Sequence, residues 1–161
     1  MRDSKVTEIE SIGVNLITQT TDSQSMNGIT FTKNADGSIT ANGTATRQAY
    51  NTMAWGDKPL SDLPNGTYML TLSGGTETPF IYISFSDGTR QMIRTNSSKS
   101  FEITDDKKID YIIFNVDVGK TVTNETYYIM LNKGKAALPY SPYFRNTIEI
   151  PEEVQALDGY G

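Results

Sequence analysis

The sequence predicts an all-β domain, folded as a sandwich or a barrel. Turn-forming Gly, Asn and Ser residues recur about every 8–12 residues, which is typical of such folds. Short runs rich in Thr, Ile, Tyr and Phe lie between these turns, and Thr is the most frequent residue of the chain. No long run shows the apolar periodicity of an amphipathic helix.

The strands can be assigned in order from their alternating apolar residues. Ile29 and Phe31 alternate with threonines, and Asp36-Gly37 follows as a turn, which together predict a hairpin with one buried face. The run 126–131 is apolar on both faces and is therefore expected at the centre of a sheet. About nine or ten strands are expected, over residues 28–33, 38–41, 47–55, 66–72, 80–86, 90–94, 101–103, 109–118 and 126–131. The residues expected to face the core are Ile29, Phe31, Tyr68, Leu70, Leu72, Ile81, Ile83, Phe85, Ile112, Phe114, Val116 and Val118.

A length of 161 residues predicts one domain. We expect the sandwich module at residues 13–144, a leading linker at 1–12, and a trailing linker at 145–161 that runs into a following domain. Residues 60–63 are expected to form one helical turn before Pro64, and residues 151–157 have the Pro and carboxylates of a helix start. The polar ends indicate a fragment of a longer protein.

The composition excludes several classes of function. The chain has no His and no Cys, so it cannot form a Ser-His-Asp triad, a Cys nucleophile, or a zinc site of imidazole and thiolate ligands. A net charge of −5 argues against binding to nucleic acid. No secretory signal is visible at the start of this sequence, and none is expected. The sequence also has no apolar run of the roughly 18 residues that span a membrane. We therefore expect a binding or structural protein, not an enzyme, without catalytic residues.

Six short stretches occur in an order that resembles a known family. They are residues 13–17 (GVNLI), 27–31 (NGITF), 36–45 (DGSITANGTA), 63–68 (LPNGTY), 127–134 (YYIMLNKG) and 139–143 (PYSPY). The series is similar to a β-sandwich module of tail and baseplate proteins from phages and prophages of Gram-positive bacteria. This resemblance implies an antiparallel two-sheet sandwich of jelly-roll type, akin to carbohydrate-binding modules.

The resemblance also implies a function and partners. It implies a non-catalytic component of a phage tail, located in the virion or encoded by a prophage, that binds a host cell-wall glycan or teichoic acid. Other tail subunits, and further copies of this chain in the virion, would be its protein partners. Two alternatives stay open: a purely structural spacer or oligomerisation domain of the tail, and a carbohydrate-binding module of a bacterial surface or secreted protein.

Residues 47–55 are the first candidate site. Sugar binding needs an aromatic face for the ring, together with amide, carboxylate or Arg groups for the hydroxyls. This run offers Arg47, Tyr50, Asn51 and Trp55, the only Trp of the chain. On a regular strand, Arg47, Asn51 and Trp55 share one face, and Gln48 and Tyr50 share the other, so only one set can line a single surface. Alternatively, Tyr50 and Trp55 pack in the core or at its rim.

Asp87, Arg90 and Arg94 form a second candidate. The two arginines share a strand face, and a guanidinium suits the bidentate binding of a phosphate or an acidic polymer. The alternative is a solvated hairpin with a local Asp–Arg pair. Tyr111, Asn115 and Asp117 are a third group, opposite the expected core stripe, in a binding groove or facing plain solvent.

No metal or cofactor is expected. Asp36 and Asp105-Asp106 supply oxygen ligands, but they do not match the spaced acidic loop of an EF-hand. A structural calcium, which jelly-roll modules often hold, has no specific signal in this sequence. The carboxylates of Glu77, Asp110, Asp117 and Glu125 show no spacing that favours the acid pair of a glycosidase.

Overall fold

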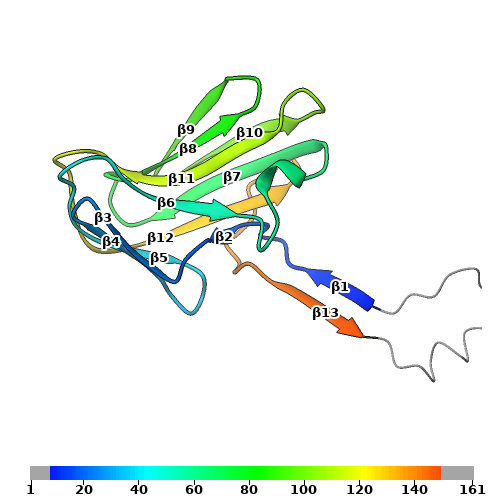
Figure 1. Ribbon diagram of the computed structural model, residues 1–161, viewed down its shortest axis with the longest axis horizontal. Helices are drawn as coiled ribbons and strands as arrows, with labels where there is room; N and C mark the ends of the chain where they lie inside the picture. The colour runs from blue at the N-terminus through cyan, green and yellow to red at the C-terminus, as the bar shows by residue number, and fades with distance from the viewer. Residues whose placement is uncertain (1–7, 150–161) are drawn as a thin grey trace, which may run out of the picture.

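The computed structural model describes residues 8–149 and consists of two antiparallel sheets packed face to face (Figure 1). One sheet has six strands in the order β10-β7-β12-β5-β4-β3, and the other has five in the order β2-β6-β11-β8-β9. A separate ribbon pairs β1 with β13. The strands are β1 (Glu8–Ile12), β2 (Thr18–Gln19), β3 (Ser23–Met26), β4 (Ile29–Lys33), β5 (Ile39–Thr44), β6 (Ala49–Ala54), β7 (Gly66–Gly74), β8 (Phe80–Phe85), β9 (Arg90–Arg94), β10 (Ser97–Ile103), β11 (Ile109–Val116), β12 (Thr121–Lys133) and β13 (Arg145–Glu149).

The predicted fold class, an antiparallel two-sheet β-sandwich, is confirmed. From β2 to β12 the chain passes repeatedly from one sheet to the other, as in a jelly roll. The two sheets hold six and five strands, more than predicted, because β2 and β3 were not expected. Both are short and polar, and they pair through their backbones with β6 and β4.

The helical content of the described chain is one short turn. The 3₁₀ helix η1 (Leu60–Asp62) lies where a single turn was predicted before Pro64. No helix within residues 8–149 is long and apolar enough to cross a membrane.

The core lies between the two sheets and uses the strand faces that the alternation predicted. Phe114 of β11 meets Phe31 of β4 edge to face, with ring centroids 5.9 Å apart. Its ring also lies 5.1 Å from that of Tyr127 on β12. All three side chains are fully buried. Since β11 belongs to one sheet and β4 and β12 to the other, this aromatic cluster joins the two layers.

The ends of the predicted elements differ from the structure in two places. Val118 was expected to face the core, but β11 ends at Val116 and Val118 is 64% exposed in the following turn. Parts of both expected linkers form structure, because Glu8–Ile12 and Arg145–Glu149 pair with each other. The helix start expected at residues 151–157 lies outside the described residues, and the domain boundaries stay a prediction.

The outer face of the six-stranded sheet is covered with hydroxyl groups. Thr and Ser side chains lie opposite one another on neighbouring strands and hydrogen-bond across them. The pairs are Ser25 with Thr30, Thr40 with Thr126, Thr44 with Thr121, and Thr71 with Ser98, at 2.8–3.2 Å. Such cross-strand pairs stabilise a sheet without an apolar layer above it, which accounts for much of the Thr content.

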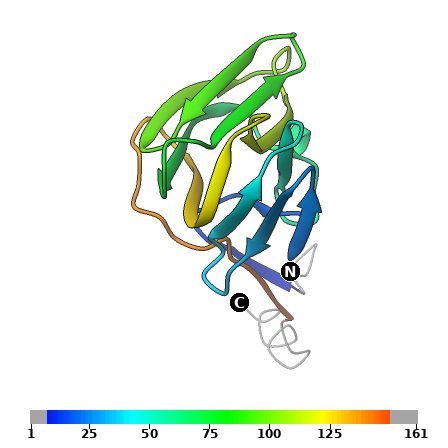
Figure 2. The same cartoon turned by 90° about the vertical axis from the view of Figure 1, so that its left-hand side faces the viewer.

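Part of this face is also covered by the chain itself. Residues 134–143 run over the outer side of β12, along the left of the molecule in Figure 2. Asn132 donates from Nδ2 to the Ala136 carbonyl at 2.9 Å, and Tyr140 packs against Tyr128 with centroids 5.0 Å apart. Met130, between these contacts on β12, is only 2% exposed. The six-stranded sheet is therefore partly closed to large ligands.

Asn15 fastens both flanks to the sandwich. Its Nδ2 donates to the carbonyls of Ile129 (3.0 Å) and Ser141 (2.9 Å). Its Oδ1 accepts from the backbone N–H groups of Ile17 and Leu131, both at 3.2 Å. The side chain is buried and uses its full capacity of two donors and two acceptors. One amide thus ties the leading segment, the trailing segment and β12 together.

Tyr140 gives the fold a pH dependence. Burial, followed by the nearby Asp36 and Tyr128, raises the pKa of Tyr140 to about 12, above the ordinary value of 10.0. Between these two values the unfolded chain releases the phenolic proton and the folded chain keeps it, so stability falls as the pH rises through this interval. We expect Tyr140→Phe to lose less stability between pH 9 and pH 11.5 than the unmodified chain, measured by urea denaturation. Equal losses of stability in the variant and the unmodified chain would contradict this prediction. The variant should keep some dependence of stability on pH, because burial also raises the pKa values of Tyr68, Tyr127 and Tyr143.

Candidate functional site

The outer face of the five-stranded sheet differs from that of the six-stranded sheet, because aromatic and apolar side chains cover it. We call this surface the platform. It consists of the outward residues Tyr50 and Thr52 of β6, Tyr111 and Ile113 of β11, Phe80, Tyr82 and Ser84 of β8, and Arg90, Met92 and Arg94 of β9. The inward residues of the same strands form the core, so the alternation of the strands builds both surfaces.

A hollow of about 360 Å³ opens on the platform between β6 and β11. It is lined by Tyr50, Thr52, Tyr111 and Ile113. Thr52 and Ile113 are paired in register and form the floor. Tyr50 is paired with Asn115, which lies two residues after Ile113 on β11, and Tyr111 lies two residues before Ile113. The two tyrosines therefore stand at opposite ends of the hollow, roughly 13 Å apart along the strands. The hollow therefore has an apolar floor and two aromatic ends that carry hydroxyls.

The platform continues from the hollow to the edge strand β9. Register places Ile113 beside Tyr82 and Tyr82 beside Met92. Phe80 packs at a right angle against Tyr82, with centroids 5.0 Å apart, and is nearly buried. Tyr82 is thereby held in place while its ring stays partly accessible. The result is a partly exposed aromatic and apolar row across three strands.

The structure separates the predicted residues of β6 by face. Tyr50 is 38% exposed and borders the hollow, whereas Asn51 is 1% exposed. Asn51 points between the sheets, because it alternates with Tyr50, so its assignment to a surface site needs correction. Of the two sets that strand geometry allowed, the one with Gln48 and Tyr50 faces outward. Gln48 donates to Oδ1 of Asn115 at 2.6 Å and covers that residue beside Tyr50.

Trp55 and Arg47 lie away from the hollow. Trp55 is at the opposite end of β6 from Tyr50, partly buried against the core, with the Lys58 ammonium 5.0 Å from its ring centroid. This placement fits the alternative that the Trp packs at the rim of the core. Arg47 is exposed in the loop before β6. The structure therefore does not bring Arg47 and Trp55 together with Tyr50 in one site.

The second predicted cluster is partly brought together. Arg90 and Arg94 are exposed on the outward face of β9, opposite Ser84 and Phe80. Asp87 instead sits in the hairpin turn and accepts from the backbone N–H (2.9 Å) and the hydroxyl (2.6 Å) of Thr89. These two hydrogen bonds lower the pKa of Asp87 below its usual value, and the bond from the Thr89 hydroxyl has the larger effect. Among the described residues, neither arginine has a carboxylate within ion-pair distance.

The third predicted group is divided in the same way. Tyr111 lies on the platform and lines the hollow. Asn115 points outward but is fully covered, and Asp117 is exposed beyond the end of β11. Asn115 Nδ2 has no hydrogen-bond partner among the described residues.

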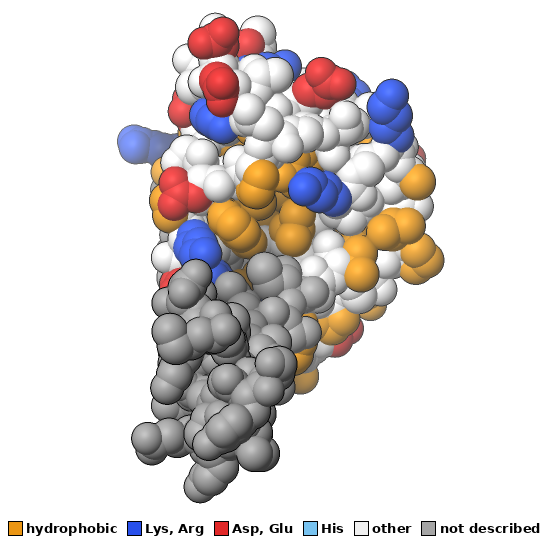
Figure 3. Space-filling view, turned by 90° about the vertical axis from the view of Figure 1, so that its right-hand side faces the viewer, with side chains coloured by type: hydrophobic (Ala, Val, Ile, Leu, Met, Phe, Trp, Pro, Cys, Tyr) orange, Lys and Arg blue, Asp and Glu red, His pale blue; other side chains and the backbone are white. Residues whose placement is uncertain are grey.

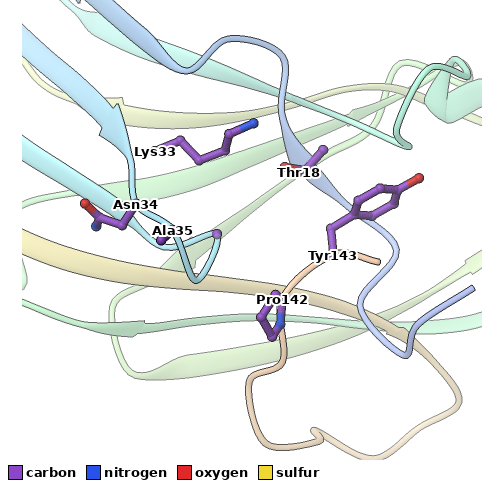
Figure 4. A pocket seen from close by; sticks show the side chains of 7 residues that line it. Thr18, Lys33, Asn34, Ala35, Pro142 and Tyr143 are labelled. Atoms are coloured by element: carbon purple, nitrogen blue, oxygen red, sulfur yellow. The ribbon is translucent and has the colours of Figure 1, made fainter. Parts of the chain in front are cut away.

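A second hollow of about 360 Å³ is a weaker candidate. It lies between β2, the β4–β5 turn and residues 142–143 (Figure 4). Its one cation, Lys33, pairs with Asp22 at 2.9 Å. The amide of Asn34 points away from it (Figure 4) and bonds the hydroxyls of Ser38 and Thr40. The polar groups around this hollow are thus largely engaged by the protein.

Charged groups within residues 8–149 do not form a metal site, and one end of the sandwich carries charges of both signs (Figure 3). No group of three or more Asp and Glu residues within residues 8–149 is placed to hold a metal ion. At the end of the sandwich that carries the β8–β9 turn, acidic and basic side chains are interspersed around a group of hydrophobic ones (Figure 3). A further hollow of about 290 Å³ beside Phe80 and Arg94 is likewise mixed, with Glu77, Asp117 and Lys120.

Several platform residues were not predicted, namely Thr52, Phe80, Tyr82, Met92 and Ile113. A signal for Phe80 and Tyr82 exists in the sequence, since the run FIYISF is apolar on both faces. That pattern indicates a strand with an apolar outer face as well as a core face. It does not tell whether another layer, a ligand or solvent covers the outer face.

The molecule is thus an antiparallel β-sandwich with one hydroxyl-rich outer face and one aromatic outer face. No protein-family model matches the sequence, and no curated protein does. Its fold is similar to that of a family 29 carbohydrate-binding module from Piromyces equi, with a TM-score of 0.42 and 13% identity over 79% of this chain and 91% of that chain. A likeness at this level concerns the fold alone, so any function has to be argued from the platform side chains.

Proposed function

We propose that the platform binds carbohydrate and that the hollow between Tyr50 and Tyr111 receives a sugar ring. The observation that carries this proposal is the pair of tyrosines at the ends of a hollow with a Thr52–Ile113 floor. The apolar side of a sugar packs well on an aromatic ring, and the tyrosine and threonine hydroxyls can bond to sugar hydroxyls. The chain performs no chemistry on the sugar in this proposal.

The contrast between the two outer faces supports this assignment. Thr and Ser hydroxyls on the six-stranded sheet bond one another, and residues 134–143 cover part of that face. On the platform, Tyr50 and Tyr111 have no hydrogen bond to another side chain within residues 8–149, and Tyr50 is well exposed. A surface with unpaired hydroxyls beside apolar area suits a ligand that combines both properties.

The proposal is tested with the variants Tyr50→Ala and Tyr111→Ala. Each is expected to weaken binding to a polysaccharide at least about tenfold, because each removes an aromatic contact at one end of the hollow. Gram-positive cell walls and a panel of soluble polysaccharides serve as ligands, in pull-down assays and calorimetry. Absence of binding by the unmodified chain, also when it is displayed in many copies, would overturn the proposal.

Two further variants separate binding from general damage. Phe144→Ala removes an aromatic side chain that is 49% exposed but lies off the platform, and it should leave binding unchanged. Trp55→Ala removes packing at the core rim, so it should lower stability while the folded fraction still binds. Loss of binding in both controls, with Tyr50→Ala unaffected, would place the ligand elsewhere.

We further propose that this binding serves a phage or prophage tail protein at the surface of a Gram-positive host. The support is the ordered series of sequence stretches, together with the absence of His and Cys from the chain. Many copies on one tail would raise a weak affinity for each sugar. Detection of the chain in purified virions by mass spectrometry tests this proposal. A bacterial surface or secreted protein is the alternative, with the same platform and a different location.

A structural spacer is the second candidate function. The pairing of β1 with β13 favours it, because the ribbon brings Glu8 and Glu149 side by side at one end of the sandwich. A spacer or oligomerisation domain should form defined oligomers and bind no sugar. Light scattering after gel filtration, together with the binding panel, separates this candidate from the first.

A further inference from the structure

We infer that the glycan bound on the platform is acidic, with its anionic groups held by Arg90 and Arg94; this inference rests on the proposed sugar binding. Both arginines point outward from β9, the edge strand next to β8. They are four positions apart, which corresponds to roughly 13 Å along the strand. They therefore form a basic rim along the side of the platform opposite the hollow.

The register connects this rim to the aromatic surface. Arg94 is paired with Phe80 and Arg90 with Ser84, while Met92 and Tyr82 lie between them. Ser84 is in turn paired with Tyr111, at one end of the hollow. A ligand that extends from the hollow to the edge of the sheet would therefore pass Tyr111 on β11, Ser84 on β8 and the guanidinium of Arg90 on β9, in that order.

The two guanidinium groups are free to take an external anion. Within residues 8–149 neither group forms an ion pair, and the one acid expected to pair with them, Asp87, is bonded to Thr89. The surroundings of the two arginines differ. Arg94 borders a hollow that is also lined by two carboxylates and a lysine, and these carboxylates compete with an external anion, whereas Arg90 is paired with the neutral Ser84. A guanidinium can bind a carboxylate or a phosphate through two parallel hydrogen bonds. We therefore expect Arg90 to contribute more than Arg94.

The two guanidinium groups, and not the net charge of the chain, favour an acidic ligand over a neutral one. The chain has a net charge of −5, so a distant polyanion is repelled, and an acidic glycan binds only where local contacts overcome that repulsion. Local contacts of this kind weaken with salt, since the groups are exposed. Two polymer chemistries share the required anion: a glycan with uronic acid carboxylates and a glycan linked by phosphodiesters.

The test uses the full chain with three soluble polymers of matched length: a neutral glycan, a uronic acid glycan and a phosphodiester-linked glycan. Arg90→Gln is expected to weaken binding to an acidic polymer at least about tenfold, Arg94→Gln less, and the double variant most. Binding of the neutral glycan should be unchanged in all three. Preference for the uronic acid glycan would identify a carboxylate as the anion, and preference for the phosphodiester-linked glycan would identify a phosphate. Either preference supports the inference if it depends on the arginines as stated.

Other outcomes overturn it. If the neutral glycan binds as tightly as both acidic ones and Arg90→Gln changes nothing, the acidic-ligand inference fails while the proposed sugar binding stands, as the loss in Tyr50→Ala would show. If no polymer binds, the proposed function itself fails. Lys135→Gln is the matched control, because Lys135 is exposed in the segment 134–143 over the outer side of β12, in the sheet that does not carry the platform. An equal loss in this variant would indicate nonspecific attraction and would overturn the inference.

Discussion

Replacement of Asn15 by alanine is expected to lower the free energy of unfolding by about 3 kcal/mol. The substitution leaves the buried N–H groups of Ile17 and Leu131 without their acceptor, and the carbonyls of Ile129 and Ser141 lose a donor. A buried polar group without a partner costs roughly 1–3 kcal/mol, and small backbone shifts recover part of that loss. Thermal or urea denaturation of the variant measures the effect.

Asn65→Ala provides the matched control for this prediction. Asn65 also makes side-chain hydrogen bonds, to Asp105 and Lys108, but these are exposed. Water replaces exposed contacts, so a change of at most about 0.5–1 kcal/mol is expected. Equal effects of the two substitutions would show that Asn15 is not a special anchor. A second readout is hydrogen exchange, in which the Leu131 amide should lose protection in Asn15→Ala.

Replacement of Phe114 by alanine is expected to cost about 4 kcal/mol, because it removes a large aromatic side chain from the centre of the core. The ring is fully buried and contacts Phe31 and Tyr127 of the opposite sheet. Its removal leaves a cavity at the point where the two layers meet, because the surrounding strands cannot collapse onto it. A single domain is stable by only about 5–15 kcal/mol, so the variant should unfold near ambient temperature or at low denaturant concentration.

Phe114→Leu distinguishes cavity formation from the loss of any particular ring contact. Leucine fills most of the volume, so a cost of about 1–2 kcal/mol is expected. Calorimetry and urea denaturation of both variants measure the difference. A loss in Phe114→Leu as large as that in Phe114→Ala would contradict the cavity explanation and would point to the aromatic contacts themselves.

The alternation of apolar and polar residues predicted most of the core, because a strand that is buried on one face has an apolar residue at every second position. Ile29 with Phe31, the Tyr68 strand and the Ile81 strand all face inward as expected. The prediction for Val118 was wrong because alternation continues past the point where the strand ends, and the turn at Gly119, with a φ of +79°, interrupts it. The strands β2 and β3 were missed because backbone pairing with a neighbour holds them, not an apolar face of their own.

The residue types of the candidate site were predictable from the sequence, but their positions on the two strand faces were not. Tyr50, Arg90 and Arg94 were candidates from the sequence, and the structure places all three on the platform. The sequence could not choose between the two faces of β6, since Asn51 and Tyr50 are equally plausible on either side of a strand. Only packing against the other sheet decides this, and it buries Asn51. The hollow itself depends on cross-strand register between β6 and β11, which no local pattern contains.

Two of the six short sequence stretches lie together in the fold. Residues 13–17 and 139–143 are far apart in the chain, yet the Asn15 side chain bonds Ser141 directly. Asn15 is also paired with Tyr143 as an isolated bridge. Two segments that are distant in the sequence therefore meet beside β12.

The β1–β13 ribbon determines how the module would respond to a pulling force. Glu8 and Glu149 are direct partners at the outer end of the ribbon, so tension between them loads the hydrogen bonds one pair at a time, as in a zipper, and not all together in shear. The ribbon therefore yields at low force, and extension stops where Asn15 holds both segments to β12. The rate at which the sandwich opens beyond that point is governed by its unfolding barrier. A strained tether would thus lengthen by the ribbon alone while the platform keeps its shape.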